Sequence, residues 1–167
     1  MFISYAQNFE DVMLWRAFKT VSCGFYVDVG ACDPTSDSLT KAFYARGWRG
    51  INIEPDRAFF EKLVSERPED VNLRIAVSAA KGVATFYEIS RRGLSTLRPE
   101  LVGLHQAAGY EVRPVEIETD TLAAICEGHA REPIHFLKID VEGSERDVLA
   151  GMDFHRWRPW VVVVEAT

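Results

Sequence analysis

The sequence is poor in the residue patterns that build disulfide-rich and zinc-binding folds. Its three cysteines, Cys23, Cys32 and Cys126, are odd in number and show no C-x-x-C spacing. Its four histidines show no H-x-x-x-H pattern. Neither a disulfide framework nor a zinc site is therefore expected.

Basic residues are fewer than acidic residues in this sequence. Lys and Arg total 19 against 25 Asp and Glu, which gives a formal net charge of -6 at pH 7. Binding to nucleic acid depends on clustered Lys and Arg side chains that neutralise phosphates. The acidic balance therefore argues against a nucleic-acid partner.

Long apolar runs are absent as well. No stretch approaches the roughly 20 apolar residues that a membrane-spanning helix needs. Polar residues follow Met1-Phe2-Ile3 at once, so no signal peptide is expected either. The 167 residues, of which 47% are hydrophobic and 26% charged, are typical of one globular domain. We expect a single cytoplasmic domain over residues 1–167.

Glycine is scarce where a dinucleotide site would require it. Gly30 follows the apolar run at residues 25–29, but no second glycine follows before Pro34, as a G-x-G-x-x-G loop would need. Asp28 and Asp33 would repel phosphate groups in a desolvated cleft. No G-x-x-x-x-G-K-[ST] motif is present. These features argue against an NAD(P)-dependent oxidoreductase, which is kept as a secondary alternative.

Two strand-loop units near the start of the chain predict a nucleoside site instead. Residues 25–30 and 50–54 are short apolar runs that would be buried in a parallel sheet, and each ends at a glycine or a carboxylate. Glu54 follows Gly30 by about 24 residues, close to where nucleotide-binding α/β folds place the acid that binds a ribose. S-adenosylmethionine has a ribose but no phosphate, and acidic loop residues would attract its cationic groups. In the alternative interpretation, Asp28 caps a turn and Glu54 is only a strand-end acid.

Strands alternate with helices along the chain, which predicts an α/β fold with a doubly wound, mostly parallel sheet and right-handed crossovers. Apolar runs predict strands at residues 25–30, 50–54, 73–77, 135–140 and 160–165. Helical spacing predicts helices at 8–19, with Asn8 as its cap, and at 38–46, 56–67, 121–130 and 144–152. Alternating patterns predict further strands at 82–89 and 111–118, and residues 91–109 are expected to be mostly loop, with room for a short helix.

A second group of polar residues lies at the end of the strand at 135–140. Lys138 and Asp140 point to the same face, because side chains alternate along a strand. Asp140 and Glu142 form a carboxylate pair at the carboxyl edge of the sheet, where one could accept a proton from a substrate hydroxyl while the other orients the cofactor. The pair and water could hold a magnesium ion, but no third ligand is evident and no metal is predicted. In the alternative interpretation, Lys138 forms a surface salt bridge with a neighbouring acid.

Four motifs occur in order along the chain. They are S-Y-A-Q-N-F-E-D at 4–11, Y-V-D-V-G-A at 26–31, I-E-P at 53–55 and K-I-D-V-E-G at 138–143. Together these motifs resemble the FkbM family of S-adenosylmethionine-dependent methyltransferases, over almost the whole chain. The resemblance implies a Rossmann-like class I methyltransferase fold. It also implies O-methylation of a hydroxyl on a sugar, glycan or natural product.

The resemblance implies a cofactor role for residues in the two strand-loop units. Carried over by position, Asp28, Gly30 and Ala31 would line the methionine part of S-adenosylmethionine. Glu54, with Pro55 beside it, would bind the ribose.

Asp140 and Glu142 would lie at the reacting end of the cofactor. Lys138, on the same strand, is the third candidate catalytic residue. Gln7, Glu10 and Asp11 match the N-terminal motif of the family and would close over the cofactor. Residues 93–96 resemble a family loop that carries a serine near the cleft.

The end of the sequence departs from this pattern. Class I methyltransferases usually continue past the fifth core strand into an antiparallel pair, whereas this sequence ends at Thr167. Residues 160–164 would then form an apolar sheet edge, which native proteins normally cover. We therefore expect a C-terminally truncated chain or one that belongs to a longer protein, or else a partner or missing segment that covers this strand.

These residues favour an S-adenosylmethionine-dependent O-methyltransferase that acts on a small-molecule or glycan hydroxyl. A substrate oxygen would displace the sulfonium methyl in line, with Asp140 or Glu142 assisting its deprotonation. The alternative from another class is a noncatalytic module that keeps the fold and binds the cofactor or a partner.

Overall fold

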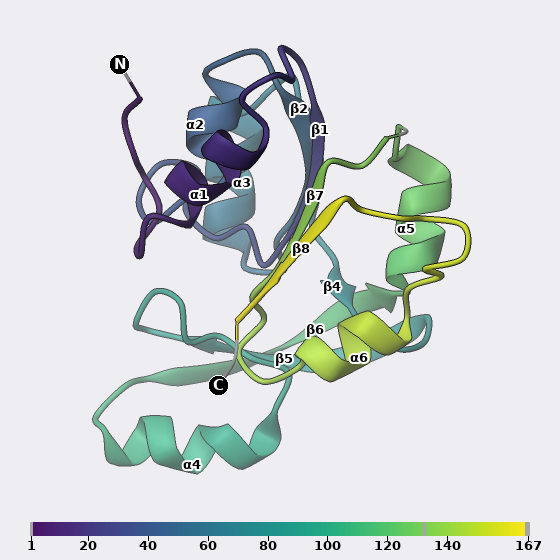
Figure 1. Ribbon diagram of the computed structural model, residues 1–167. Helices are drawn as coiled ribbons and strands as arrows, with labels where there is room; N and C mark the ends of the chain where they lie inside the picture. The colour runs from purple at the N-terminus through teal and green to yellow at the C-terminus, as the bar shows by residue number, and fades with distance from the viewer. Residues whose placement is uncertain (1, 132, 166–167) are drawn as a thin grey trace.

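The computed structural model describes residues 2–131 and 133–165 and has a five-stranded sheet at its centre (Figure 1). Its strands are β1 (Phe25–Val29), β2 (Arg49–Ile53), β3 (Val71–Leu73), β7 (Phe136–Ile139) and β8 (Val161–Val164). Their spatial order is β3-β2-β1-β7-β8, and every neighbouring pair is parallel. The predicted α/β fold with a doubly wound, Rossmann-like parallel sheet is confirmed.

The order of the strands reverses between β1 and β7. From β1 the chain passes to β2 and then to β3 on one side, and it later places β7 and β8 on the other side of β1. The loops after β1 and β7 therefore open at the carboxyl edge of the sheet, where such folds bind their ligands. This topology brings Gly30 against the backbone of Asp140.

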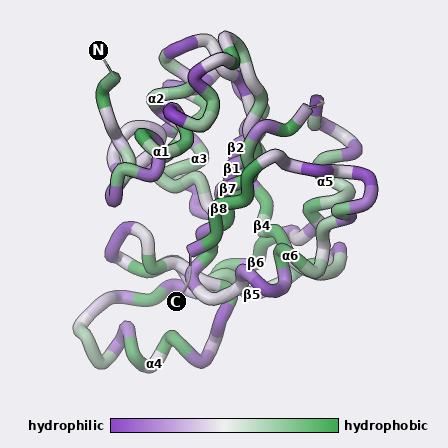
Figure 2. The backbone as a smooth tube through the Cα atoms, viewed as in Figure 1, coloured by the Kyte–Doolittle hydropathy of each residue, from purple (hydrophilic) through white to green (hydrophobic). Residues whose placement is uncertain are grey.

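The first face of the sheet is covered by two helices, α5 (Leu122–His129) and α6 (Glu145–Ala150) (Figure 1). Val27 and Val29 point to this face and pack with apolar residues of both helices. The strands β7 and β8 are hydrophobic along most of their length (Figure 2), and the residues of β1 are all buried, as expected for a central strand of a parallel sheet.

The second face is covered by helices as well (Figure 1). Tyr26 and Phe136 point to this face, and their rings stack with centroids 5.6 Å apart. Asp28 and Lys138 are paired in register two residues further along the same strands, so they point to this face as well. The helices are α1 (Glu10–Ala17), α2 (Lys41–Tyr44) and α3 (Arg57–Glu66).

Most of the predicted helices are confirmed with shorter bounds. The largest difference is in α2, which has four residues and is followed by Gly47 with a φ of +87°. The helix α3 begins where predicted, because the Asp56 side chain accepts hydrogen bonds from the amides of Ala58 and Phe59. No helix within residues 2–131 and 133–165 combines the length and the apolar character that a membrane crossing requires.

The start of the first helix differs from the prediction. Asn8 does not cap it. Instead α1 begins after Phe9, whose φ of 63° lies in the left-handed region. The fully buried Asp11 accepts hydrogen bonds from the segment before the helix, namely from Ser4 Oγ at 2.7 Å, Tyr5 N at 2.7 Å and Ala6 N at 3.3 Å. Asp11 thus ties the preceding segment to the helix, whereas no side chain among the described residues caps the first amides of α1.

A second, three-stranded sheet was not predicted as a unit. The expected strand at 73–77 is divided, because the chain leaves the central sheet after β3 and then forms β4 (Ala76–Val77). The order of the second sheet is β4-β6-β5, with β5 (Gly82–Ile89) antiparallel to β6 (Val112–Asp120). The predicted strands at 82–89 and 111–118 are therefore confirmed.

The segment expected to be mostly loop contains a nine-residue helix, α4 (Pro99–Ala107). Pro99 stands in its first turn, where the missing amide hydrogen is not needed. No residue of α4 is buried, so the apolar periodicity that identifies packed helices is absent from this segment. The helix extends outward from the second sheet (Figure 1).

The last strand lies at the edge of the central sheet. Within the described residues, β8 pairs only with β7. Trp160 is 59% exposed, and Val162 and Val164 are 39% exposed each. The expected apolar edge is thus present, while the partner or segment that would cover it stays a prediction.

Candidate active site

An open cleft with a cavity volume of about 90 Å³ lies at the carboxyl ends of β1, β2 and β7. The loops after these three strands contribute Gly30, Glu54 and Asp140, and the second sheet closes the cleft from the other side. The cleft therefore lies where the strand order reverses.

Gly30 allows the first and third of these loops to touch. Its φ is +76°, and a Cβ atom at this position would lie 1.8 Å from the carbonyl oxygen of Asp140. The amides of Gly30 and Ala31 both donate to the carbonyl oxygen of Ile53, at 2.9 Å and 3.2 Å. Gly30 lines the cleft, whereas Ala31 is buried and does not.

Glu54 is a buried carboxylate that lines the cleft. Its Oε2 accepts a hydrogen bond from the amide of Cys32 at 2.8 Å, and its Oε1 accepts one from the amide of Asp56 at 2.8 Å. Burial raises the pKa of Glu54 to about 7, although these two amides favour the ionised form. Pro55, the next residue, also lines the cleft.

Asp28 lies beneath the cleft rather than in its lining. Its Oδ2 accepts a hydrogen bond from Thr40 Oγ1 at 2.9 Å, and its Oδ1 lies 3.4 Å from Lys138 Nζ. Lys138 also contacts Asp140 Oδ2 at 3.3 Å. The predicted salt bridge of Lys138 exists, but it is largely buried and not on the surface.

The loop after β7 holds two carboxylates at the cleft. Glu142 has a φ of 53°, in the left-handed region that a residue with a side chain rarely adopts, and Gly143 follows with a φ of 96°. This local conformation carries strain that surrounding contacts must offset. Asp140 and Glu142 both line the cleft, as their position after a parallel strand predicts.

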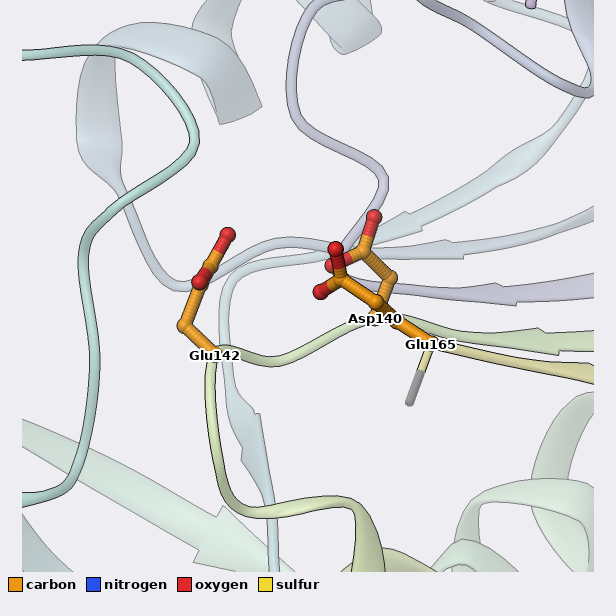
Figure 3. Close-up of side chains that lie close together, drawn as sticks. All are labelled: Asp140, Glu142 and Glu165. Carbon is orange, nitrogen blue, oxygen red and sulfur yellow. The ribbon is translucent and has the colours of Figure 1, made fainter. Parts of the chain in front are cut away.

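Glu165 is a third carboxylate at this place, and its role in the site was not predicted. Figure 3 shows its side chain beside that of Asp140, with Glu142 facing both. One oxygen from each of the three carboxylates lies within 4.8 Å of the others. Glu165 follows β8 as Glu54 follows β2, so its place after a parallel strand was a usable signal.

Crowding of these acids affects their protonation. Burial, followed by the charges of Asp140 and Glu145, raises the pKa of Glu142 to about 7, against the opposing effect of Lys138. A hydrogen bond with Asp140, followed by burial, raises the pKa of Glu165 to about 7. Three carboxylate oxygens this close could hold a divalent cation. A third carboxylate, which the sequence analysis did not identify, therefore lies beside Asp140 and Glu142.

The N-terminal residues of the predicted site are not in the cleft lining. Gln7 is exposed, and Glu10 Oε2 accepts a hydrogen bond from the amide of Asn8 at 3.0 Å. Neither of them, nor Asp11, is among the residues that line the cleft. Their closing over a cofactor stays a prediction.

The loop between β5 and α4 lies over the cleft and is joined to the Glu142 loop. Gly93 and Ser95 line the cleft, in the segment expected to carry a serine near it. The buried Thr96 donates a hydrogen bond from Oγ1 to the carbonyl oxygen of Glu142 at 2.7 Å. Arg98 Nε donates to the carbonyl oxygen of Gly143 at 2.8 Å.

The apolar wall of the cleft was not predicted. It contains Phe59 from α3, Ile75 and Val77 from the segment that leaves the central sheet, Phe86 from β5 and Leu97. Most of these residues belong to or adjoin the second sheet, whose association with the first depends on contacts between distant parts of the chain.

The sequence from the first cleft loop onward matches a family model described as Methyltransferase FkbM domain, over residues 28–167. The chain belongs to the FkbM methyltransferase family. The matched residues include Gly30, Glu54, Asp140 and Glu142, and they begin after the N-terminal motif at 4–11. No curated protein and no solved structure is significantly similar to the chain. The family membership supports methyl transfer as its chemistry.

Proposed function

We propose that this FkbM-family protein transfers the methyl group of S-adenosylmethionine to a hydroxyl of a sugar, glycan or other natural product. The observation that carries the proposal is the position of the Glu54 carboxylate and its hydrogen bonds. Its carboxylate is buried at the end of β2, lines the cleft, and is oriented by two backbone amides. A carboxylate has about four acceptor sites, so sites remain for the two hydroxyls of a ribose.

The rest of the cleft suits a cationic nucleoside. Gly30 leaves the floor of the first loop without a side chain, and Phe59 and Ile75 offer apolar surface for a base. Asp140 and Glu142 supply negative charge that favours the sulfonium and ammonium groups of S-adenosylmethionine. The same charges would repel the pyrophosphate of NAD, which supports S-adenosylmethionine rather than NAD as the cofactor.

The two cleft carboxylates differ in a way that supports separate roles. Asp140 forms an ion pair with Lys138, whereas within the described residues Glu142 forms none. The pKa of Glu142, about 7, suits a general base that works near neutral pH. We therefore assign proton removal from the acceptor hydroxyl to Glu142. Asp140 is assigned to orienting the cofactor.

S-adenosylmethionine supplies an activated methyl group when bound. The chain contributes the rest: Glu54 orients the ribose, Asp140 orients the methionine end, and Glu142 holds the proton that leaves the acceptor oxygen. Alignment of the bound groups is expected to supply much of the acceleration. The loop that carries Ser95 closes the cleft from above and would help to exclude water.

Transfer of a labelled methyl group tests the proposal. The protein is incubated with S-adenosylmethionine labelled in the methyl group and a panel of sugars, glycans and hydroxylated small molecules. We expect label to enter at least one acceptor and the transfer to depend on Glu142. Cofactor binding without transfer to any acceptor would instead favour a noncatalytic binding module.

A further inference from the structure

A chain of buried polar contacts runs beneath the central sheet and ends at the cleft. It starts at Arg67, the residue that follows α3, whose side chain is fully buried. Arg67 Nη2 donates to the carbonyl oxygen of Pro34 at 2.5 Å and to Ser38 Oγ at 3.0 Å. Arg67 thereby holds the long loop that begins at Gly30.

The next contacts lead from Arg67 to β1. Arg67 Nη1 donates to Thr40 Oγ1 at 3.4 Å, and Thr40 Oγ1 in turn donates to Asp28 Oδ2 at 2.9 Å. Thr40 is 1% exposed, so its hydroxyl has no access to solvent that could replace either contact. The hydroxyl orients the Asp28 carboxylate by binding one of its two oxygens.

The last contacts lead from Asp28 to both cleft loops. The other carboxylate oxygen of Asp28, Oδ1, lies 3.4 Å from Lys138 Nζ. Lys138 Nζ donates to the carbonyl oxygen of Gly30 at 2.5 Å and contacts Asp140 Oδ2 at 3.3 Å. One ammonium group therefore joins the loop after β1 to the loop after β7.

We propose that Arg67 and Thr40 are positioning residues of the active site, which act through Asp28 to hold Lys138 where it joins the Gly30 and Asp140 loops. Lys138 is then a positioning residue too, which revises its predicted catalytic role. The consequence for methyl transfer rests on the proposed function, whereas the joining of the two loops does not.

Charge burial supports a role beyond stability. Removing ionised groups from water is costly, and apolar side chains of similar volume often stabilise a protein equally well. Here Arg67, which lies 3.7 Å from the buried Asp70, reaches Asp28 through the Thr40 hydroxyl. The charges of Asp28, Lys138 and Asp140 then alternate in sign, and this series ends at the two loops that form the cleft. Such an arrangement fixes the relative position of the Gly30 and Asp140 loops.

Thr40→Val is the variant that tests the proposal. It keeps the shape of the side chain and removes the hydroxyl that links Arg67 to Asp28. Thr40→Ser restores the hydroxyl. Thr119→Val is the matched control, because Thr119 is also buried, its Oγ1 donates to the carbonyl oxygen of Ala80, and it is not among the residues that line the cleft.

Two measurements are made on the full chain. Amide hydrogen exchange follows the amides of Gly30 and Asp140, which donate to Ile53 O and Val29 O at 2.9 Å and 3.0 Å. Calorimetry follows the affinity for S-adenosylmethionine. In Thr40→Val we expect faster exchange at both amides and weaker binding, each by about 2- to 30-fold. Thr40→Ser and Thr119→Val should behave as the parent does.

Exchange at Gly30 and Asp140 that is unchanged in Thr40→Val would overturn the proposal, and so would equal effects of Thr119→Val. If the parent does not bind S-adenosylmethionine, the proposed function fails, but the exchange measurement still decides the positioning role. Should Thr40→Val not fold, a chain with both Asp28→Asn and Lys138→Met replaces it, because this pair removes one charge of each sign. Faster exchange at Gly30 and Asp140 is then expected in this double variant, and unchanged exchange would overturn the proposal.

Discussion

Gly30 and Asp140 approach so closely that a Cβ atom on Gly30 would lie 1.8 Å from the carbonyl oxygen of Asp140. The loops after two neighbouring parallel strands thus meet backbone to backbone at the floor of the cleft.

Gly30→Ala should separate the two loops. The added Cβ must displace the backbone at Asp140, and a positive φ alone costs an alanine about 1–2 kcal/mol. We expect lower thermal stability and loss of S-adenosylmethionine binding, measured by thermal denaturation and calorimetry. Gly109→Ala is the control, because Gly109 also has a positive φ but has no atom within 4 Å of its ideal Cβ position. Equal effects of both substitutions would contradict the close contact as the cause.

Glu54→Gln should weaken S-adenosylmethionine binding while leaving the fold intact. A hydrogen bond to a charged group is worth about 1.5–3 kcal/mol, which corresponds to roughly 10- to 100-fold in affinity. The control is Glu61→Gln, which removes an exposed carboxylate that pairs with Arg57 on α3. Unchanged affinity in a folded Glu54→Gln protein would remove Glu54 from the site.

Glu142→Gln and Asp140→Asn should affect different steps. If Glu142 is the base, its replacement lowers turnover by roughly 10²–10⁴ at saturating cofactor. Asp140→Asn should mainly raise the cofactor concentration needed for half-maximal rate, because Asp140 orients the cofactor and Glu142 is still present. Steady-state kinetics with labelled methyl groups separates the two effects. Full turnover in Glu142→Gln would exclude it as the base.

Turnover should increase with pH through about 7. Only the carboxylate form of Glu142 can accept a proton, and its pKa is about 7. The neighbouring charge of Asp140 contributes to that raised pKa, so Asp140→Asn should move the midpoint of the pH profile to lower pH. A profile that stays flat from about pH 5 to about pH 8 would contradict the assignment of Glu142 as general base.

Stability of the free protein should depend on pH through Glu54. Burial raises the pKa of Glu54 from its ordinary value of 4.5 to about 7, so the folded protein binds a proton more readily than the unfolded chain. The contribution of Glu54 to stability is then fully present below pH 4.5 and is lost as the pH rises through about 7. Urea denaturation of the parent and of Glu54→Gln at several pH values measures it. Glu54→Gln should show a smaller loss of stability over this interval than the parent does.

The central sheet could be predicted because its strands carry a local signal. Residues 25–29 and 136–139 are apolar runs interrupted by one charged residue each, Asp28 and Lys138, and each run is followed by a residue that belongs to the cleft. Strand-end carboxylates such as Glu54 and Asp140 could be located for the same reason, since parallel strands align their carboxyl ends along one edge.

Other features depend on contacts that no local pattern reports. The strand β4 has two residues, too few for any periodicity, and α4 buries none of its side chains. Arg67 stands at the end of a helix, where an arginine is usually solvated, yet it is fully buried by residues from distant loops. Gln7 and Glu10 were assigned by resemblance alone, and the cleft lining does not include them.

A calorimetric titration of the free protein with S-adenosylmethionine, and a separate one with NAD, tests the central claim most directly. The cleft carboxylates and the orientation of Glu54 predict saturable one-site binding of S-adenosylmethionine and no detectable binding of NAD. That binding should be weaker in Glu54→Gln and unchanged in Glu61→Gln. Binding of NAD but not of S-adenosylmethionine, or binding that is indifferent to Glu54, would contradict the account.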